Sequence, residues 1–404
     1  MMTWASTRCK TAVSCQPSPL SSHFRSVMFC PGLRRQGRSF VRGLFALVVA
    51  AGLSSAWLTS QVNSATPDAS PKIPTSGSTI ALHASSTMNV ASEMGGAFMS
   101  GSKCDSEGNL YIRKYAMDRP LLGPVVKIDP EGKRKALFDP AAFSRLALDR
   151  ADAFSPVSDG GMDQIAQSGV LQPRIYVLHF SADGSPSSAT RLDADFEVYT
   201  FAAFADGNFL LSGVQRDVQD KNDRGRDFTA VFSADGRELA QLSFEDPRGA
   251  AKASAKADAG AHRNDVQKVA PKAAEKPAPT LDLAEAEVGS DGDLYVMRVS
   301  SPALVYVIAS SGKIMRTLKI AAPSPGAVAS AFHISGNRLA ISFWNEESQS
   351  QTVVVADAQT GRKIASYEDP TGLALSCYSA NEGVFTFLNL GEGNELEVIR
   401  AEPQ

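Results

Sequence analysis

From about residue 90 to the C-terminus, the chain repeats a turn of Asp, Asn or Glu with Gly, followed by a run of hydrophobic residues. The clearest copies lie at 107–112, 206–211 and 291–296, and weaker copies lie at 335–341 and 381–385. Turns of this kind accept a positive φ, and the aromatic and β-branched residues beyond them favour strands. Each copy therefore predicts a β-hairpin.

A second pattern follows each copy of the first, and in it a hydrophobic strand leads into a turn that contains Gly. Its copies lie at 125–133, 177–184, 230–237, 305–313 and 353–362. This pattern also predicts a hairpin. Two hairpins in succession make one four-stranded antiparallel sheet.

The spacing of these sheets predicts how they are arranged. The first turns fall at Gly108, Gly160, Gly207, Gly292, Gly336 and Gly383, with spacings of 52, 47, 85, 44 and 47 residues. A four-stranded sheet cannot bury both faces alone, and sheets recurring at this period stack around an axis in a β-propeller. We therefore expect an all-β fold, a six-bladed β-propeller. The alternative is a row of β-sandwich domains, which seldom repeat the same two turns in a fixed order.

The last repeat is one strand short, because a third strand at 394–400 is followed only by residues 401–404. The segment Ser78–Ala84 precedes the first repeat and would supply the missing strand, closing the ring and covering two strand edges. Cys104 and Cys377 then fall late on the innermost strands of the first and last blades. We expect a disulfide between them, with two buried free thiols as the alternative.

The 85-residue interval contains an insertion at 246–280, inside a propeller domain that spans 78–404. The insertion is rich in Ala, Lys and Pro and has few large apolar residues. Such a tract has little surface to bury against the entropy of ordering it. We expect it to be disordered or only partly helical.

The N-terminal 65 residues hold seven Lys and Arg and no Asp or Glu, whereas the rest of the chain has 33 basic and 43 acidic residues, a net charge of −10. Four of those arginines precede an apolar run at 43–53, and small residues follow at 54–56. This order is typical of a secretory signal peptide. We expect residues 1–56 to be that signal and the protein to be periplasmic or secreted.

Two alternatives remain open at the N-terminus. The basic region is long if translation begins at Met1, so Met28 is an alternative start. The apolar stretch at 43–58 is shorter than the roughly 20 residues that span a bilayer, but if it stayed uncleaved it would anchor the protein to a membrane. Residues 57–77 are expected to be a linker.

The turns at 106–112, 205–211 and 290–296 resemble the repeats of six-bladed propellers of the NHL class, and of the broader group with gluconolactonase-like and TolB-like propellers. The resemblance covers nearly all of residues 79–404 and suggests an exported bacterial protein. It implies a scaffold, because members of these families are binding platforms, hydrolases or lyases.

Most catalytic and metal-binding motifs are absent. The four histidines beyond residue 65 fall on separate predicted elements, which argues against a shared zinc site; they are His83, His179, His262 and His333. The loop at 220–225 begins like a calcium loop but has Arg224 at its fifth position. A net charge of −10 disfavours nucleic acid binding. We predict no cofactor.

The resemblance to gluconolactonase-like propellers implies an alternative with a divalent metal at the mouth of the channel. Glu285 and Glu287 are the nearest acidic residues on a predicted innermost strand, and Asp282 is a third candidate. If this alternative held, the protein would be a metal-dependent lactonase or another hydrolytic enzyme.

Four loops are expected to emerge on one face of the propeller: 213–227, 246–280, 114–123 and 344–351. Long loops on a rigid scaffold often carry recognition, although loops can also vary without binding anything. The contact candidates are Tyr115, Arg119, Arg216, Asp217, Arg224 and Trp344. We expect a monomeric binding scaffold, not an enzyme, that holds an unknown protein or small molecule at this face.

Overall fold

The computed structural model describes residues 79–169, 174–192, 197–215, 225–244, 283–369, 372–373, 375–391 and 395–404. These residues form four separate four-stranded antiparallel sheets and one eight-stranded sheet. The first sheet contains β2 (Phe98–Cys104), β3 (Leu110–Lys114), β4 (Val125–Ile128) and β5 (Arg134–Phe138). The second contains β6 (Arg150–Pro156), β7 (Met162–Ser168), β8 (Arg174–Phe180) and β9 (Pro186–Leu192).

The third sheet contains β10 (Glu197–Ala203), β11 (Phe209–Gln215), β12 (Arg226–Phe232) and β13 (Glu238–Gln241). The fourth contains β14 (Leu283–Val288), β15 (Leu294–Arg298), β16 (Ala303–Ile308) and β17 (Ile314–Ile320). The helical elements are short: α1 (Ala91–Met94) and the 3-10 helices η1 (Pro140–Ala142) and η2 (Ser144–Leu146). Among the described residues, no helix is long and apolar enough to cross a membrane.

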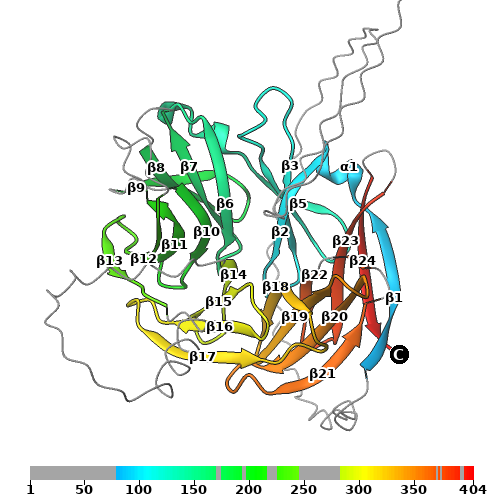
Figure 1. Cartoon of the computed structure of the whole chain (residues 1–404). Coiled ribbons are helices and arrows are strands. Elements are labelled where there is room, and N and C mark those ends of the chain that lie inside the picture. Colours follow the sequence, from blue (N-terminus) through cyan, green and yellow to red (C-terminus); the bar gives the residue numbers. More distant parts are fainter. Residues whose placement is uncertain are drawn as a thin grey trace, which may run out of the picture. The chain divides into compact units, whose positions relative to one another are not determined.

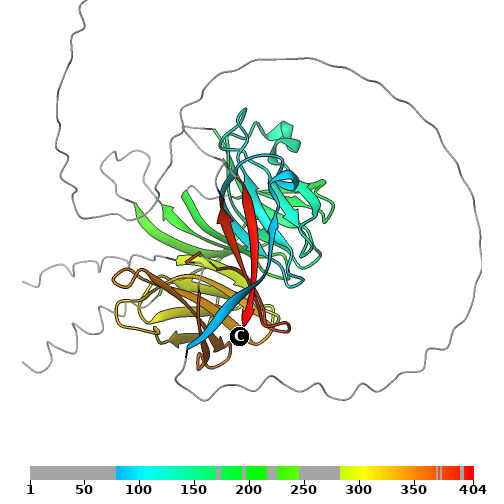
Figure 2. The ribbon, with the colours of Figure 1, turned by 90° about the vertical axis from the view of Figure 1, so that its right-hand side faces the viewer.

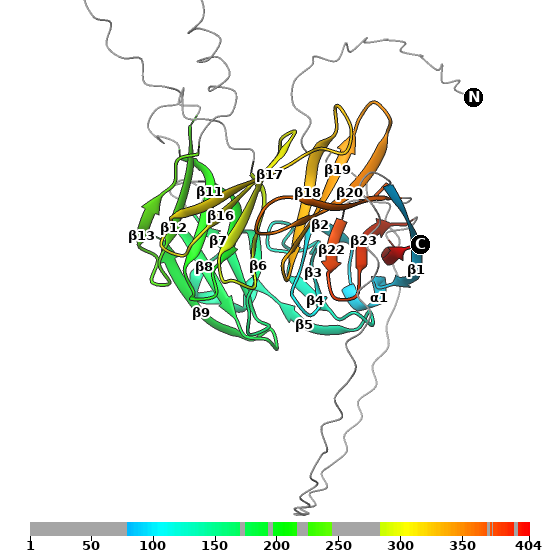
Figure 3. The same ribbon diagram turned by 90° about the horizontal axis from the view of Figure 1, so that it is seen from below.

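The eight-stranded sheet consists of two four-stranded antiparallel halves. One half contains β18 (Val328–Ser335), β19 (Arg338–Asn345), β20 (Ser350–Asp357) and β21 (Lys363–Glu368). The other contains β22 (Leu375–Ser379), β23 (Val384–Leu390), β24 (Leu396–Pro403) and the N-terminal strand β1 (Thr79–Asn89). Figures 1 and 3 show the sheets following one another in chain order around a common axis.

Strand β1 closes the ring as predicted. It pairs antiparallel with β24, from Leu82 opposite Pro403 to Asn89 opposite Glu397, and Figure 2 shows the two strands side by side. The expectation of six separate sheets was wrong in one respect. β1 is longer than the predicted Ser78–Ala84 segment, and its first three residues pair in parallel with β21. This pairing joins the last two sheets into one.

The hydrophobic core lies between neighbouring four-stranded units. There are six apolar clusters in the described part of the chain, and each draws on two consecutive units. One cluster packs Tyr295 of β15 against Phe332 and Phe343 of the next unit. The cluster that closes the ring packs Ile112 of β3 against Val398 of β24. Middle strands are therefore buried on both faces, as the run of hydrophobic residues in β4 and β15 requires.

The predicted disulfide is present. Cys104 at the end of β2 is bonded to Cys377 on β22, with the two Cα atoms 5.6 Å apart. The bond joins the innermost strands of the first and last units beside the closing cluster. The predicted signal peptide (1–56), linker (57–77) and insertion (246–280) lie outside the described residues.

We expect a Cys104→Ala/Cys377→Ala variant to lose roughly 2–4 kcal/mol of unfolding free energy, because the bond closes a loop with a sequence separation of 273 residues. Urea unfolding of the variant and of the parent, each with and without reductant, measures this loss. The parent protein treated with reductant is the control and should lose stability by a similar amount. Equal unfolding midpoints for the variant and the untreated parent would show that the disulfide does not stabilise the closed ring.

Candidate functional site

One end of the ring carries two of the loops that the sequence singled out, 114–123 and 344–351, whereas 246–280 and most of 213–227 lie outside the described residues. The innermost strand of each unit begins at this end, and the second strand of the unit ends here. The innermost strands are β2, β6, β10, β14, β18 and β22. In each hairpin, the first residues of the innermost strand pair with the last residues of the second strand. Three such pairs are Phe98 with Lys114, Leu283 with Arg298 and Val328 with Trp344. We call this end the loop face. The register places Tyr115 and Trp344 there, although their role in binding stays a prediction.

The other predicted contact residues differ in what surrounds them. Arg119 forms two hydrogen bonds of 2.7 Å with the Asp139 carboxylate, and this bonding raises the pKa of its guanidinium. Arg119 therefore ties the β3–β4 loop to the segment after β5, a partner that the repeat pattern does not reveal. Arg216, Asp217 and Arg224 lie outside the described residues.

A cavity of about 490 Å³ opens near the axis. It lies toward the loop face, because it is lined by the first residues of β22 and the last residues of β23. Its polar lining is Ser102, Glu285, Ser330, Ser376 and Asn389. Its apolar lining includes Leu373, Leu375, Leu388 and Leu390. Glu285, a predicted metal candidate, is therefore a cavity residue.

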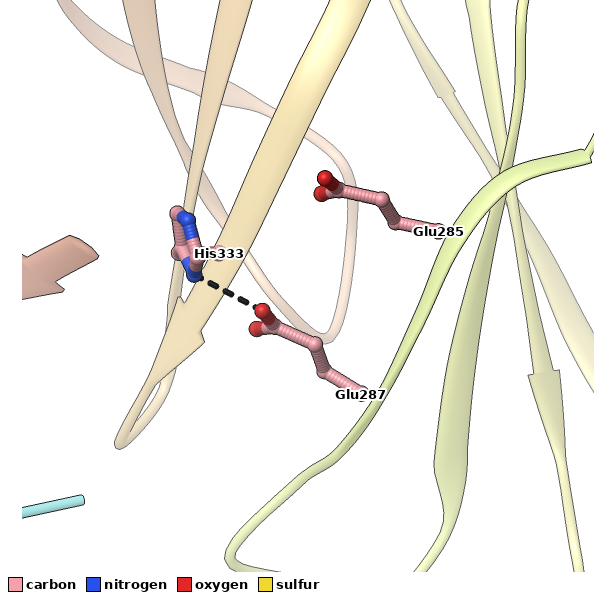
Figure 4. Close-up of side chains that lie close together, drawn as sticks. All are labelled: Glu285, Glu287 and His333. Atoms are coloured by element: carbon pink, nitrogen blue, oxygen red, sulfur yellow. Dashed lines mark ion pairs between the residues drawn. The ribbon is translucent and has the colours of Figure 1, made fainter. Parts of the chain in front are cut away.

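Glu285 and Glu287 bridge two innermost strands. Alternate residues of a strand share a face, so both side chains point from β14 toward β18 (Figure 4). Glu285 Oε2 accepts a hydrogen bond from Phe332 N at 3.2 Å, and Glu287 Oε2 accepts one from Ile334 N at 3.0 Å. Strand β18 lies at the edge of its sheet, so these carboxylates satisfy backbone N–H groups that no strand covers.

His333 is held between the same strand and the next one. Its Nδ1 lies 2.7 Å from Glu287 Oε1, and it also forms a backbone hydrogen bond with Leu375 of β22. The side chain is buried. Burial disfavours the imidazolium, but the charges of Glu287 and Glu285 and these hydrogen bonds outweigh it and raise the pKa of His333. The two hydrogen bonds favour the protonated form of the ring.

Lys103 reaches across the axis from β2. Its Nζ lies 3.1 Å from Ala286 O on β14 and 3.4 Å from Phe201 O on β10. Burial lowers the pKa of Lys103, and the nearby Glu287 and Glu285 oppose this effect. We call Lys103, Glu285, Glu287 and His333 the axial cluster. Through it, side chains of three innermost strands contact β10 and β22 as well.

The axial cluster fits a metal ion poorly as it is arranged. Glu285, Glu287 and His333 offer ligand atoms that lie within 4.8 Å of one another, and carboxylate and imidazole ligands are typical of zinc. However, His333 Nδ1 faces Glu287, each carboxylate accepts a backbone N–H, and a buried lysine stands beside them. Asp282, the third predicted candidate, lies outside the described residues.

Sequence reasoning missed the pairing of Glu287 with His333. A signal for it existed, since both hydrogen bonds from the glutamates to β18 join residues 47 apart, which is close to the repeat period. Residues one repeat apart lie on neighbouring innermost strands. Shifting each acidic residue by one repeat would have brought Glu287 next to His333.

No protein-family model matches the chain, and a comparison with curated proteins finds no match. Among solved structures, the chain is similar to a protein of unknown function from Bacteroides caccae, at 10% identity over 68% of this chain and 82% of that one, with a TM-score of 0.40. It is also similar to the Dos1 propeller, at 12% identity over 73% and 74%, with a TM-score of 0.35.

A third similar structure is the Neurospora crassa Pan2 WD40 domain, at 9% identity over 81% of this chain and 97% of that one, with a TM-score of 0.36. With such low identities and TM-scores, nothing about this chain can be inferred from the named proteins. The assignment of a propeller rests on the strand order and the six clusters described above. The narrower resemblance to NHL-class, gluconolactonase-like or TolB-like propellers stays a prediction.

We expect Glu287→Gln to lower the unfolding free energy by about 3 kcal/mol near pH 6, because it leaves buried His333 without its counter-charge. The folded pKa of His333 is raised above 6.5, so this stabilisation is present below pH 6.5 and is lost as the pH rises through the folded pKa. Urea unfolding between pH 5.5 and 9 measures it. A loss independent of pH would contradict the ion pair.

The matched control is Glu382→Gln. Glu382 pairs with Arg400, but its side chain is 60% exposed, and exposed pairs contribute less than about 1 kcal/mol. This variant should unfold close to the parent at every pH.

Proposed function

We propose that the protein is an exported β-propeller that binds a ligand at the axial opening of its loop face. The cavity of about 490 Å³ carries this proposal. Its size lies within the range of small-molecule pockets, and apolar walls with a few polar groups are typical of such sites. The ligand is a small molecule or a side chain of a partner protein.

The hydrogen bonding around Glu285 supports binding. Glu285 lines the cavity, and Glu287 lies two residues further along β14, away from the loop face. Lys103 crosses the axis by bonding to Ala286, between these two residues. Glu285 therefore belongs to a bonded cluster that extends from the cavity away from the loop face. A preformed site binds with less loss of conformational freedom than one that must be ordered.

Exposed apolar side chains on the loop face support contact with a larger partner. Met117 and Leu121 of the β3–β4 loop are 87% and 54% exposed, and Leu390 at the cavity is 56% exposed. Exposed apolar side chains that gather near one opening often mark an interaction surface. The disulfide agrees with export, because such bonds persist in oxidising compartments.

A metal-dependent hydrolase is the second candidate, and one observation favours it: Glu285, Glu287 and His333 converge. Their mutual bonding makes the metal-free binding protein the better account. Metal analysis of the purified protein separates the two functions. Stoichiometric zinc or calcium that resists dialysis would favour the hydrolase.

We expect Ser330→Trp to abolish binding at the opening, because the exposed Ser330 lines the cavity and an indole ring would fill it. Mass spectrometry of small molecules and proteins retained from an envelope extract measures binding. The matched control is Met315→Trp on the outermost strand β17, where the parent side chain is already 49% exposed. If both folded variants retained the same components as the parent, the cavity would not be the binding site.

A further inference from the structure

We propose that the axial cavity takes a primary ammonium group on an aliphatic stem, as in a lysine side chain or an alkyl diamine. The ammonium would lie at Glu285, and the stem would lie along the leucines of the cavity wall. This inference rests on the proposed function, because it specifies the ligand of the same cavity.

Glu285 has one carboxylate oxygen that the fold leaves open. Its Oε2 accepts the Phe332 N–H, whereas Oε1 has no hydrogen-bond partner among the described residues. Within the same part of the chain, Glu285 forms no ion pair, in contrast to Glu287, which binds His333. Among the described residues that line the cavity, Glu285 is the one with an ionisable side chain. A ligand that enters the cavity therefore meets one acidic group.

The neighbouring cation does not fill this position. Lys103 Nζ is directed at the carbonyl oxygens of Phe201 and Ala286. Burial raises the pKa of Glu285, and the charge of Glu287 raises it further, against the effects of His333 and Lys103. The surrounding positive charge therefore does not fully offset the cost of burying the ionised Glu285 carboxylate. A ligand ammonium would supply the missing charge through a charge-assisted hydrogen bond.

The rest of the lining suits the remainder of such a ligand. Leu375, Leu388 and Leu390 offer apolar surface to methylene groups, and lysine side chains commonly bury their stems in this way. An ammonium has three donors and no acceptor. The side-chain oxygens of Ser102, Ser330 and Asn389 lie in the same lining and are acceptors of the required kind. An anionic ligand would meet no cationic side chain among the described residues of this lining.

Calorimetric titration with three probes tests the inference. The probes are Nα-acetyl-lysine amide, Nα-acetyl-norleucine amide, which has a comparable stem without the ammonium, and cadaverine. We expect the lysine derivative to bind at least about tenfold more tightly than the norleucine derivative, since hydrogen bonds to charged groups are the stronger ones. Binding of cadaverine at equal strength would identify a free diamine, and weaker binding would identify a side chain; both support an ammonium site.

Glu285→Gln should reduce the affinity for the lysine derivative to that for the norleucine derivative. The matched control is Glu238→Gln, which removes an exposed carboxylate from the outermost strand β13, outside the cavity lining, and should leave binding unchanged. In the parent protein, affinity should fall as the pH drops through the pKa of Glu285. This last measurement needs no variant, so a folding defect in Glu285→Gln would not remove the test.

Equal affinity of the lysine and norleucine derivatives, or undiminished lysine binding by folded Glu285→Gln, would overturn the inference. A different result tests the proposed function. If Ser330→Trp still abolished retention from the extract while no ammonium probe bound, the cavity would be a binding site for another class of ligand. If neither effect appeared, both proposals would fall.

Discussion

The structure depends on one constraint: a four-stranded antiparallel sheet with two apolar faces is stable only between two neighbours. Six apolar clusters meet this constraint, and the sixth exists only because β1 and β24 pair and bring the last unit against the first. The Cys104–Cys377 bond fastens the same joint. The pairing of β1 with β24 therefore supports the closed ring, since an open ring would expose two sheet faces and two edges.

Closing the ring creates a second requirement at its centre. Each innermost strand has one edge without a partner strand, and its backbone polar groups need other partners. The axial cluster provides them for part of this edge, with glutamates accepting N–H groups of β18 and Lys103 donating to carbonyls of β10 and β14. One of these groups, Glu285, also lines the cavity. Its Oε2 completes the backbone bonding of β18, and its Oε1 is the atom that we propose meets a ligand.

Much of the fold followed from local signals in the sequence. Gly207 and Gly292, predicted to lie in turns, have φ values of 86° and 82°, and the closing strand followed from the missing fourth strand of the last repeat. The parallel pairing of Thr79 with Ser366 was not predictable, because backbone pairing of this kind leaves no hydrophobic pattern in the sequence. For the site, the resemblance to gluconolactonase-like propellers singled out Glu285 and Glu287, whereas His333 was expected to lie apart from other site residues and Lys103 was not singled out. Their contacts cross between units, and one sequence shows them only when residues are compared across a whole repeat.

The most direct test of the central claim is the titration of the Glu285 side-chain carboxyl. It can be followed by NMR in protein labelled with ¹³C at glutamate carboxyls, with the Glu285→Gln variant providing the assignment. We expect a midpoint above the ordinary value of 4.5 in the free protein and a downward shift when Nα-acetyl-lysine amide is added. An ordinary midpoint that the probe does not move would contradict the claim.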